Sequence, residues 1–228
     1  MLIFILFVII VAVAYGPQLW IRYVFAKYSR NLDEIPGNGH QLAVHLLKVF
    51  EFEEVKVERT KPGNDHYSPD DNVVRLSPAV HDGNSLTAIA VAAHEVGHAL
   101  QFNRQEPVSR LRKRYLVTAH NIQRVGSALL MASPVALAIF RVPHAMLFTG
   151  GIGVATMLAA VAMNMAVLPE EWDASFNKAL PILAEGNYVT PAQMPKVKTI
   201  LQAAALTYVA KALADILSLW RWLAILRR

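Results

Sequence analysis

The chain has 228 residues, of which 54% are hydrophobic and only 17% are charged, with a formal net charge of +5 and no cysteine. Soluble domains average roughly a quarter charged residues, so this composition disfavours an ordinary soluble domain and favours a membrane protein. A chain without cysteine has no disulfide, thiolate metal site or cysteine nucleophile, which leaves His, Asp and Glu as metal ligands.

An apolar segment opens the chain with "MLIFILFVIIVAVAY" and continues into "GPQLWI". Its length of about 20 residues is enough to cross a hydrocarbon core about 30 Å thick. No basic residue precedes it, unlike a cleaved signal peptide. Interfacial aromatic and basic residues follow its apolar part, namely Trp20, Arg22, Tyr23 and Lys27. We therefore predict a retained transmembrane anchor over residues 1–21.

The region 22–123 is more polar and is predicted to hold the chemistry. Leucines at helical spacing predict a helix from Gly39, and alternation in "VKVERT" predicts a strand. A helix is expected to begin after Ser85 or Asn84 and to continue through about Phe102. A short β-branched run before that helix predicts a second strand, made of Val73, Val74, Arg75 and Leu76.

The later helix carries "HEVGH" at residues 94–98. His94 and His98 lie one turn apart, so both imidazoles face the same side and can bind one metal ion. Glu95 lies beside them, where a carboxylate can take a proton from zinc-activated water and pass it to the leaving amine of a peptide. The zincin pattern predicts one Zn²⁺ ion and a third protein ligand from elsewhere in the chain.

Two long apolar runs flank "RVPH" and predict a transmembrane hairpin over 124–168. A hairpin returns the chain to the side it left, so the next polar region, 169–206, is expected to face the same compartment as 22–123. The last segment, 207–228, is predicted to be a membrane-associated or transmembrane helix, because its tryptophans adjoin arginine and its few charges can pair.

Basic residues accumulate near the membrane ends of the anchor-to-hairpin segment: Arg22, Lys27, Arg30, Arg104, Arg110, Arg112, Lys113 and Arg114. The hairpin tip carries only Arg141. Positive residues mark the cytoplasmic side, so the active site is predicted to face the cytoplasm. A topogenic role for these residues explains the positive net charge, and no nucleic-acid partner is expected.

The third ligand is sought in "LPEEWDASFNKAL", directly after the hairpin, because the extended pattern with a third histidine is absent. Adjacent helical residues diverge by about 100°, so only one of Glu170 and Glu171 can face the histidines. Pro169 suits a helix start and leaves Glu170 in the first turn, where its charge favours the helix dipole. Asp173 is the other nearby carboxylate, with helix capping as an equal alternative role.

The segments "VVRLS", "SLTAIAVAAHEVGHALQ", "EEWDAS" and "LQAAALTYVAKAL" together resemble the YugP-like neutral zinc metallopeptidases, membrane-anchored bacterial proteins, over nearly the whole chain. The chain is more remotely similar to HtpX-type membrane proteases and their CAAX-protease relatives. That resemblance implies a bacterial plasma-membrane location and puts the third ligand at Glu171. The remote relatives place an aspartate four residues later to orient a ligating histidine. Ser175 stands there, so Ser175 or Asp173 is the predicted partner.

Substrate contacts leave weaker signals. If Val73–Leu76 is an edge strand beside the active-site helix, an extended substrate can add to it through backbone hydrogen bonds. A donor for the transition-state oxyanion is sought among His66, Tyr67 and Tyr188, although a structural role is the alternative for each.

These observations predict a mainly α integral membrane protein with a zincin-like catalytic region, a short β edge, an anchor and a helical hairpin. The predicted function is a zinc metalloendopeptidase that acts on peptide or protein substrates at the lipid bilayer. An intramembrane site-2-type protease is one alternative, but "NMAVLPEEWD" lacks its Asn-x-x-Pro signature. A non-catalytic zinc-bound scaffold is the other, although such a site needs no general base like Glu95.

Overall fold

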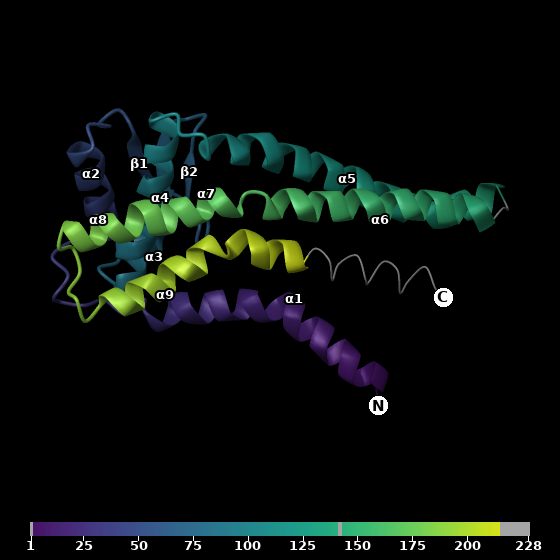
Figure 1. Ribbon diagram of the computed structural model, residues 1–228, viewed down its shortest axis with the longest axis horizontal. Coiled ribbons are helices and arrows are strands. Elements are labelled where there is room, and N and C mark those ends of the chain that lie inside the picture. Colours follow the sequence, from purple (N-terminus) through teal and green to yellow (C-terminus); the bar gives the residue numbers. More distant parts are fainter. Residues whose placement is uncertain (1, 141–142, 215–228) are drawn as a thin grey trace. The chain divides into compact units, whose positions relative to one another are not determined.

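The structure is a computed structural model that describes residues 2–140 and 143–214. These residues form helices and one small sheet, which confirms the predicted mainly α fold with a short β part (Figure 1). The chain separates into two compact units, which we name the sheet unit and the hairpin unit. The sheet unit comprises Leu19–Arg110 and Pro169–Thr207, and the hairpin unit comprises Met1–Gln18, Leu111–Leu168 and Tyr208–Arg228.

The sheet has three strands, β1 (Lys56–Arg59), β2 (His66–Ser68) and β3 (Val73–Leu76), in the order β1-β3-β2. Strand β3 is parallel to β1 and antiparallel to β2. Both predicted strands are confirmed, but the prediction that Val73–Leu76 is an edge strand is wrong. Strand β3 is central, because the chain adds β2 on its other side. The three residues of β2 are too few and too polar to give a strand pattern in the sequence.

Two short helices flank the sheet. Helix α2 (Gly39–Val49) begins at the predicted residue, where Asn38 and Gln41 form a capping box. The Asn38 side chain accepts a hydrogen bond from the Gln41 N–H at 2.9 Å. Helix α3 (Pro78–His81) follows β3. A capping box satisfies two backbone N–H groups at the helix start, which explains why α2 starts at this point.

Helix α4 (Leu86–Asn103) is the central element of the sheet unit. Ser85 caps it by accepting a hydrogen bond from the Ala88 N–H at 3.1 Å, which confirms one of the two predicted caps. All of its residues from Leu86 to Gln101 are buried, and the helix contacts α2, α3, β2, β3 and the segments after residue 169. The polar groups of "HEVGH" therefore lie inside protein, where each needs a partner.

The second part of the sheet unit packs against this buried helix. It consists of α7 (Leu168–Trp172), the π-helical segment η1 (Asp173–Ala179), α8 (Leu180–Glu185) and α9 (Met194–Ala205). A Cβ atom on Gly97 would lie only 2.8 Å from the Ala174 carbonyl oxygen. Glycine at this position therefore allows η1 to approach α4 closely enough for side chains of the two elements to meet.

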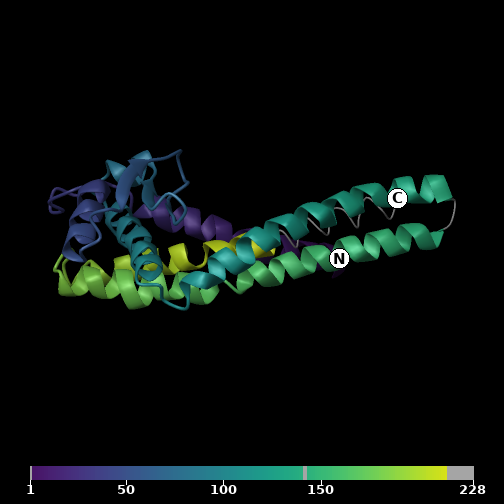
Figure 2. The same cartoon turned by 90° about the horizontal axis from the view of Figure 1, so that it is seen from above.

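The hairpin unit contains α5 (Ser109–Phe140) and α6 (Pro143–Met165), which lie side by side in both ribbon views (Figures 1 and 2). A Cβ atom on Gly126 would lie 2.5 Å from the Thr156 Oγ1, so the helices touch there. Helix α5 begins at Ser109, well before the predicted residue 124. The prediction missed its first turns because they are polar and contain no long apolar run. Residues 141–142 of the predicted connection lie outside the described residues.

The two ends of the chain also contribute helices. Helix α1 (Leu2–Lys27) includes the predicted anchor. Residues 207–214 are helical, with Ala210 and Ala212 buried. The Gln18 Nε2 lies 3.4 Å from the Ala210 carbonyl oxygen, so these segments meet within the hairpin unit. The rest of the predicted C-terminal helix, residues 215–228, lies outside the described residues.

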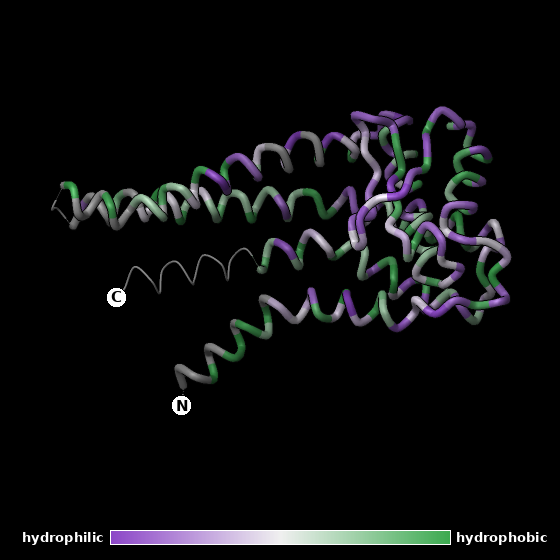
Figure 3. Tube along the Cα trace, turned by 180° about the vertical axis from the view of Figure 1, so that it is seen from behind, coloured by the Kyte–Doolittle hydropathy of each residue, from purple (hydrophilic) through white to green (hydrophobic). Residues whose placement is uncertain are grey.

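Among the described residues, one helical stretch, Gly150–Glu185, is long and apolar enough to cross a membrane, by length and composition alone. It comprises most of α6 together with α7, η1 and α8. Only 28% of its most apolar 18-residue window is buried. Figure 3 shows the hydrophobic colouring that runs along most of α6, in contrast to the hydrophilic loops of the sheet unit.

Candidate active site

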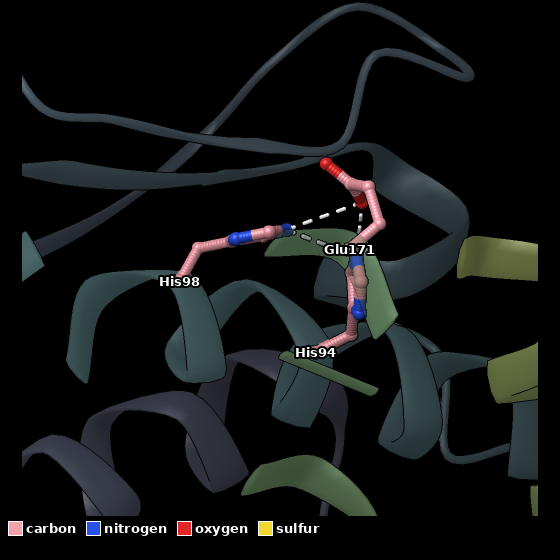
Figure 4. A group of neighbouring side chains, drawn as sticks. All are labelled: His94, His98 and Glu171. Atoms are coloured by element: carbon pink, nitrogen blue, oxygen red, sulfur yellow. Dashed lines mark hydrogen bonds and ion pairs between the residues drawn. The ribbon is translucent and has the colours of Figure 1, made fainter. Parts of the chain in front are cut away.

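Three buried side chains converge within the sheet unit (Figure 4). The Nε2 atoms of His94 and His98 are 3.2 Å apart. The Oε2 atom of Glu171 lies 3.3 Å from each of them. Glu171 comes from α7, and the histidines come from consecutive turns of α4. The structure therefore brings together the three residues that the sequence predicted as metal ligands.

The spacing of these three atoms fits a zinc ion. Tetrahedral zinc with bonds of about 2.0–2.2 Å needs neighbouring ligand atoms about 3.3–3.5 Å apart. The observed separations of 3.2, 3.3 and 3.3 Å are close to that value. Two imidazoles and one carboxylate are also the donor set of a class of catalytic zinc sites that keeps a fourth position for water.

The tautomer of His94 follows from its hydrogen bonds. Its Nδ1 lies 3.0 Å from the Ser175 Oγ, and that hydroxyl donates to the Leu201 carbonyl oxygen at 3.2 Å. Because the hydroxyl proton is used on Leu201, the oxygen of Ser175 accepts from the His94 Nδ1–H. The Nε2 lone pair is then directed at the site. Ser175 lies where the sequence predicted a partner for a ligating histidine.

His98 has a different partner, which the sequence analysis missed. Its Nδ1 lies 2.9 Å from the Oε1 of Gln101, a fully buried residue on the same helix. The Gln101 Nε2 donates to Asp173 Oδ2 at 2.8 Å and to the Glu170 carbonyl oxygen at 3.0 Å. Asp173 therefore reaches the histidine only through Gln101. The available signal was a polar residue three positions after His98, on the same helical face.

Glu95 is buried next to the two histidines, and its carboxylate is oriented by the sheet. The backbone N–H of Tyr67, on β2, donates to Glu95 Oε2 at 2.9 Å. A backbone donor stabilises the charged carboxylate in a low-dielectric interior. The residue predicted as general base thus has one carboxylate oxygen tied to the backbone of β2.

Glu170 has more than a role at a helix start. Its side chain is fully buried, and its Oε1 lies 3.8 Å from the His98 Nδ1. The sequence predicted a carboxylate that favours the helix dipole, but the packing also places it beside His98. Glu171 nevertheless supplies the third corner of the triangle of ligand atoms, so only one of the two adjacent glutamates faces both Nε2 atoms.

The three oxyanion candidates lie in different places. The His66 Nδ1 is 2.8 Å from the Asn64 carbonyl oxygen, and the Tyr188 hydroxyl is 2.9 Å from the His45 Nε2 on α2. Burial raises the pKa of the Tyr67 hydroxyl, which donates to Asn72 Oδ1 at 2.7 Å. Each of these hydrogen bonds gives its residue a structural role. The oxyanion role remains a prediction for all three.

Comparisons with known proteins give the family of this chain. The family model described as "Putative neutral zinc metallopeptidase" matches residues 3–227. The chain is 32% identical over 225 residues to the "Putative membrane protease YugP" of Bacillus subtilis (strain 168), covering 96% of each chain. No solved structure matches. The family model spans nearly the entire sequence, including α4 and α7. The chain therefore belongs to the neutral zinc metallopeptidase family.

Proposed function

We propose that this chain is a membrane-anchored zinc endopeptidase in which His94, His98 and Glu171 hold one zinc ion and Glu95 acts as general base. The observation that carries the proposal is the triangle of ligand atoms with sides of 3.2, 3.3 and 3.3 Å. The carboxylate of Glu95, oriented by the Tyr67 N–H, supplies the group that a purely structural metal site does not need.

The side chains divide the reaction between them. Zinc, when bound, lowers the pKa of a water molecule and polarises a peptide carbonyl. Glu95 takes a proton from the attacking water and gives it to the amine that leaves when the peptide bond breaks. Ser175 and Gln101 keep the Nδ1 protons of the two histidines in place, so that both Nε2 atoms remain available as ligands. Burial of α4 excludes competing water from these groups.

Membrane anchoring is proposed from the apolar segments. Residues 1–21 serve as an anchor and 124–168 as a transmembrane hairpin, with the cytoplasmic regions 22–123 and 169–206 forming the catalytic part. The exposed face of α6 and the membrane protease among the relatives support this arrangement. The C-terminal segment, 207–228, is proposed as a membrane-associated or transmembrane helix. Because protein surrounds α4 itself, a membrane-anchored enzyme is favoured over a site-2-type intramembrane site.

The test is the variant Glu95→Gln, purified in detergent and assayed on an unfolded protein substrate. Removal of a general base is expected to lower the cleavage rate by about 10²- to 10⁴-fold while zinc remains bound. The control is Glu58→Gln on β1, an exposed carboxylate of the same unit, which should keep full activity. Wild-type activity in Glu95→Gln would exclude the proposed mechanism. Loss of zinc from Glu95→Gln would show that this residue is a ligand instead.

A further inference from the structure

A buried glutamine links the two parts of the metal centre. Gln101 lies on α4 three residues after His98, and its side chain is fully buried. Its amide contacts His98 on one side and Asp173 and the Glu170 backbone on the other. Water has no access to the Gln101 amide or to His98, so the hydrogen bond of His98 Nδ1 depends on Gln101 itself.

The orientation of the amide is determined by its neighbours. The Nε2 lies 3.0 Å from the Glu170 carbonyl oxygen and 2.8 Å from Asp173 Oδ2. A carbonyl oxygen and an ionised carboxylate only accept hydrogen bonds, so the NH₂ group of Gln101 must face them. The Oε1 is then left to face the His98 Nδ1 at 2.9 Å. It can only accept, and so the proton of His98 is placed on Nδ1.

Asp173 is itself held in position by two donors. Lys178 Nζ lies 3.1 Å and Asn177 Nδ2 2.7 Å from its carboxylate oxygens. Lys178 also pairs with Glu106 Oε2 at 2.9 Å. The ion pair with Lys178 keeps Asp173 charged and prevents the carboxylate from turning away from Gln101. Asp173, the acceptor that orients Gln101, is therefore held on η1 by a partly buried, charge-assisted network.

We infer that Gln101 is a positioning residue for the metal centre: anchored by Asp173, it holds His98 with the proton on Nδ1 and the Nε2 lone pair directed at the site. This inference rests on the proposed zinc function. The two histidines then have separate controls, since Ser175 of η1 orients His94 and the Gln101–Asp173 pair orients His98. Partners of this kind change metal affinity by about 10- to 100-fold when they are lost.

The test compares Gln101→Met with Gln193→Met by measuring zinc affinity in competition with a chromophoric chelator. Gln193 is the matched control, because it is also buried, accepts from the Thr190 N–H and donates towards Glu34. Gln101→Met should lose about 10- to 100-fold in zinc affinity and change the visible spectrum of the cobalt(II)-substituted protein. Gln193→Met should keep both properties, even if its thermal stability falls. Wild-type zinc affinity in Gln101→Met would overturn the inference.

A pair of charge-exchange variants separates positioning from simple loss of packing. Gln101→Glu keeps an acceptor for His98 but faces Asp173 with a second carboxylate, so zinc affinity should fall. The double variant Gln101→Glu/Asp173→Asn restores the hydrogen bond between positions 101 and 173, but not the one to the Glu170 carbonyl oxygen, and should recover about tenfold of the lost affinity. No recovery would overturn the inference. Wild-type zinc affinity in His98→Ala would overturn the metal site itself, and the proposed function with it.

Discussion

Helices α4 and α6 have similar apolar compositions and different surroundings. Both are rich in alanine and other apolar residues, yet α4 is buried from Leu86 to Gln101. Large apolar side chains of α6, by contrast, are exposed, among them Phe148, Ile152 and Leu158. The comparison teaches that hydropathy alone does not separate a helix buried in a protein core from a helix with an exposed apolar face. What distinguishes the two helices is whether protein covers the apolar surface or leaves it exposed.

The largest expected effect is all-or-none and concerns the side of the membrane that each region faces. The chain has no native cysteine, so single cysteines can be introduced at three exposed residues, Arg104, Glu185 and His144. An impermeant thiol reagent added to intact cells should label only the cysteine at 144, near the hairpin tip. Opposite labelling of 104 and 185 would be incompatible with one site, and labelling of both from outside would reverse the orientation.

The next effect tests whether α7, which lies against α4, supplies a zinc ligand. Loss of a hydrogen-bond partner of a metal ligand weakens metal binding by about 10- to 100-fold. Glu171→Gln impairs a proposed zinc ligand itself, so it should weaken zinc binding by at least that factor. Glu170→Gln should change zinc affinity less, since its oxygen lies 3.8 Å from His98 and outside the triangle of ligand atoms. Zinc titrations of both variants measure the difference. A loss confined to Glu170→Gln would exchange the two assignments.

The exposed face of α6 gives a third test. Leu158→Asp places a charge on that face, which should cost about 2.5–3.5 kcal/mol if the residue lies in the hydrocarbon core. The membrane-integrated fraction after alkaline extraction should therefore fall. Val49→Asp, on the exposed side of α2, is the control and should change little. Equal integration of the two variants would mean that the Leu158 face of α6 does not contact lipid.

The smallest effect compares glycines on the two helices. Gly97→Ala brings a methyl group to 2.8 Å from the Ala174 carbonyl oxygen and should destabilise the sheet unit by about 1–3 kcal/mol. A Cβ at Gly151 on α6 meets no atom within 4 Å. Gly151→Ala should therefore be neutral or stabilise by up to about 1 kcal/mol. Thermal unfolding in detergent measures both, and an unchanged midpoint in Gly97→Ala would contradict the close approach of η1 to α4.

Several features were predictable because they depend on residues close together in the chain. The helix starts at Gly39 and after Ser85 follow from capping and leucine spacing within one or two turns. The shared face of His94 and His98 follows from the helical repeat. Strand β2 was missed for the opposite reason. Its three residues carry no periodic pattern, and only pairing with β3 makes them a strand.

The sequence by itself determined the helix that presents His94 and His98 on one face, and its resemblance to other proteases pointed to Glu171 as their third partner. Tertiary structure decided which partners orient these groups, because such contacts join residues far apart in the chain. Ser175 meets His94 across 81 positions, and Gln101 meets Asp173 across 72. A π-helical segment changes the angular spacing of side chains from the α-helical value, so the facing of η1 does not follow from counting residues. Packing against Gly97 fixes that facing and, with it, the surroundings of His94, His98 and Glu171.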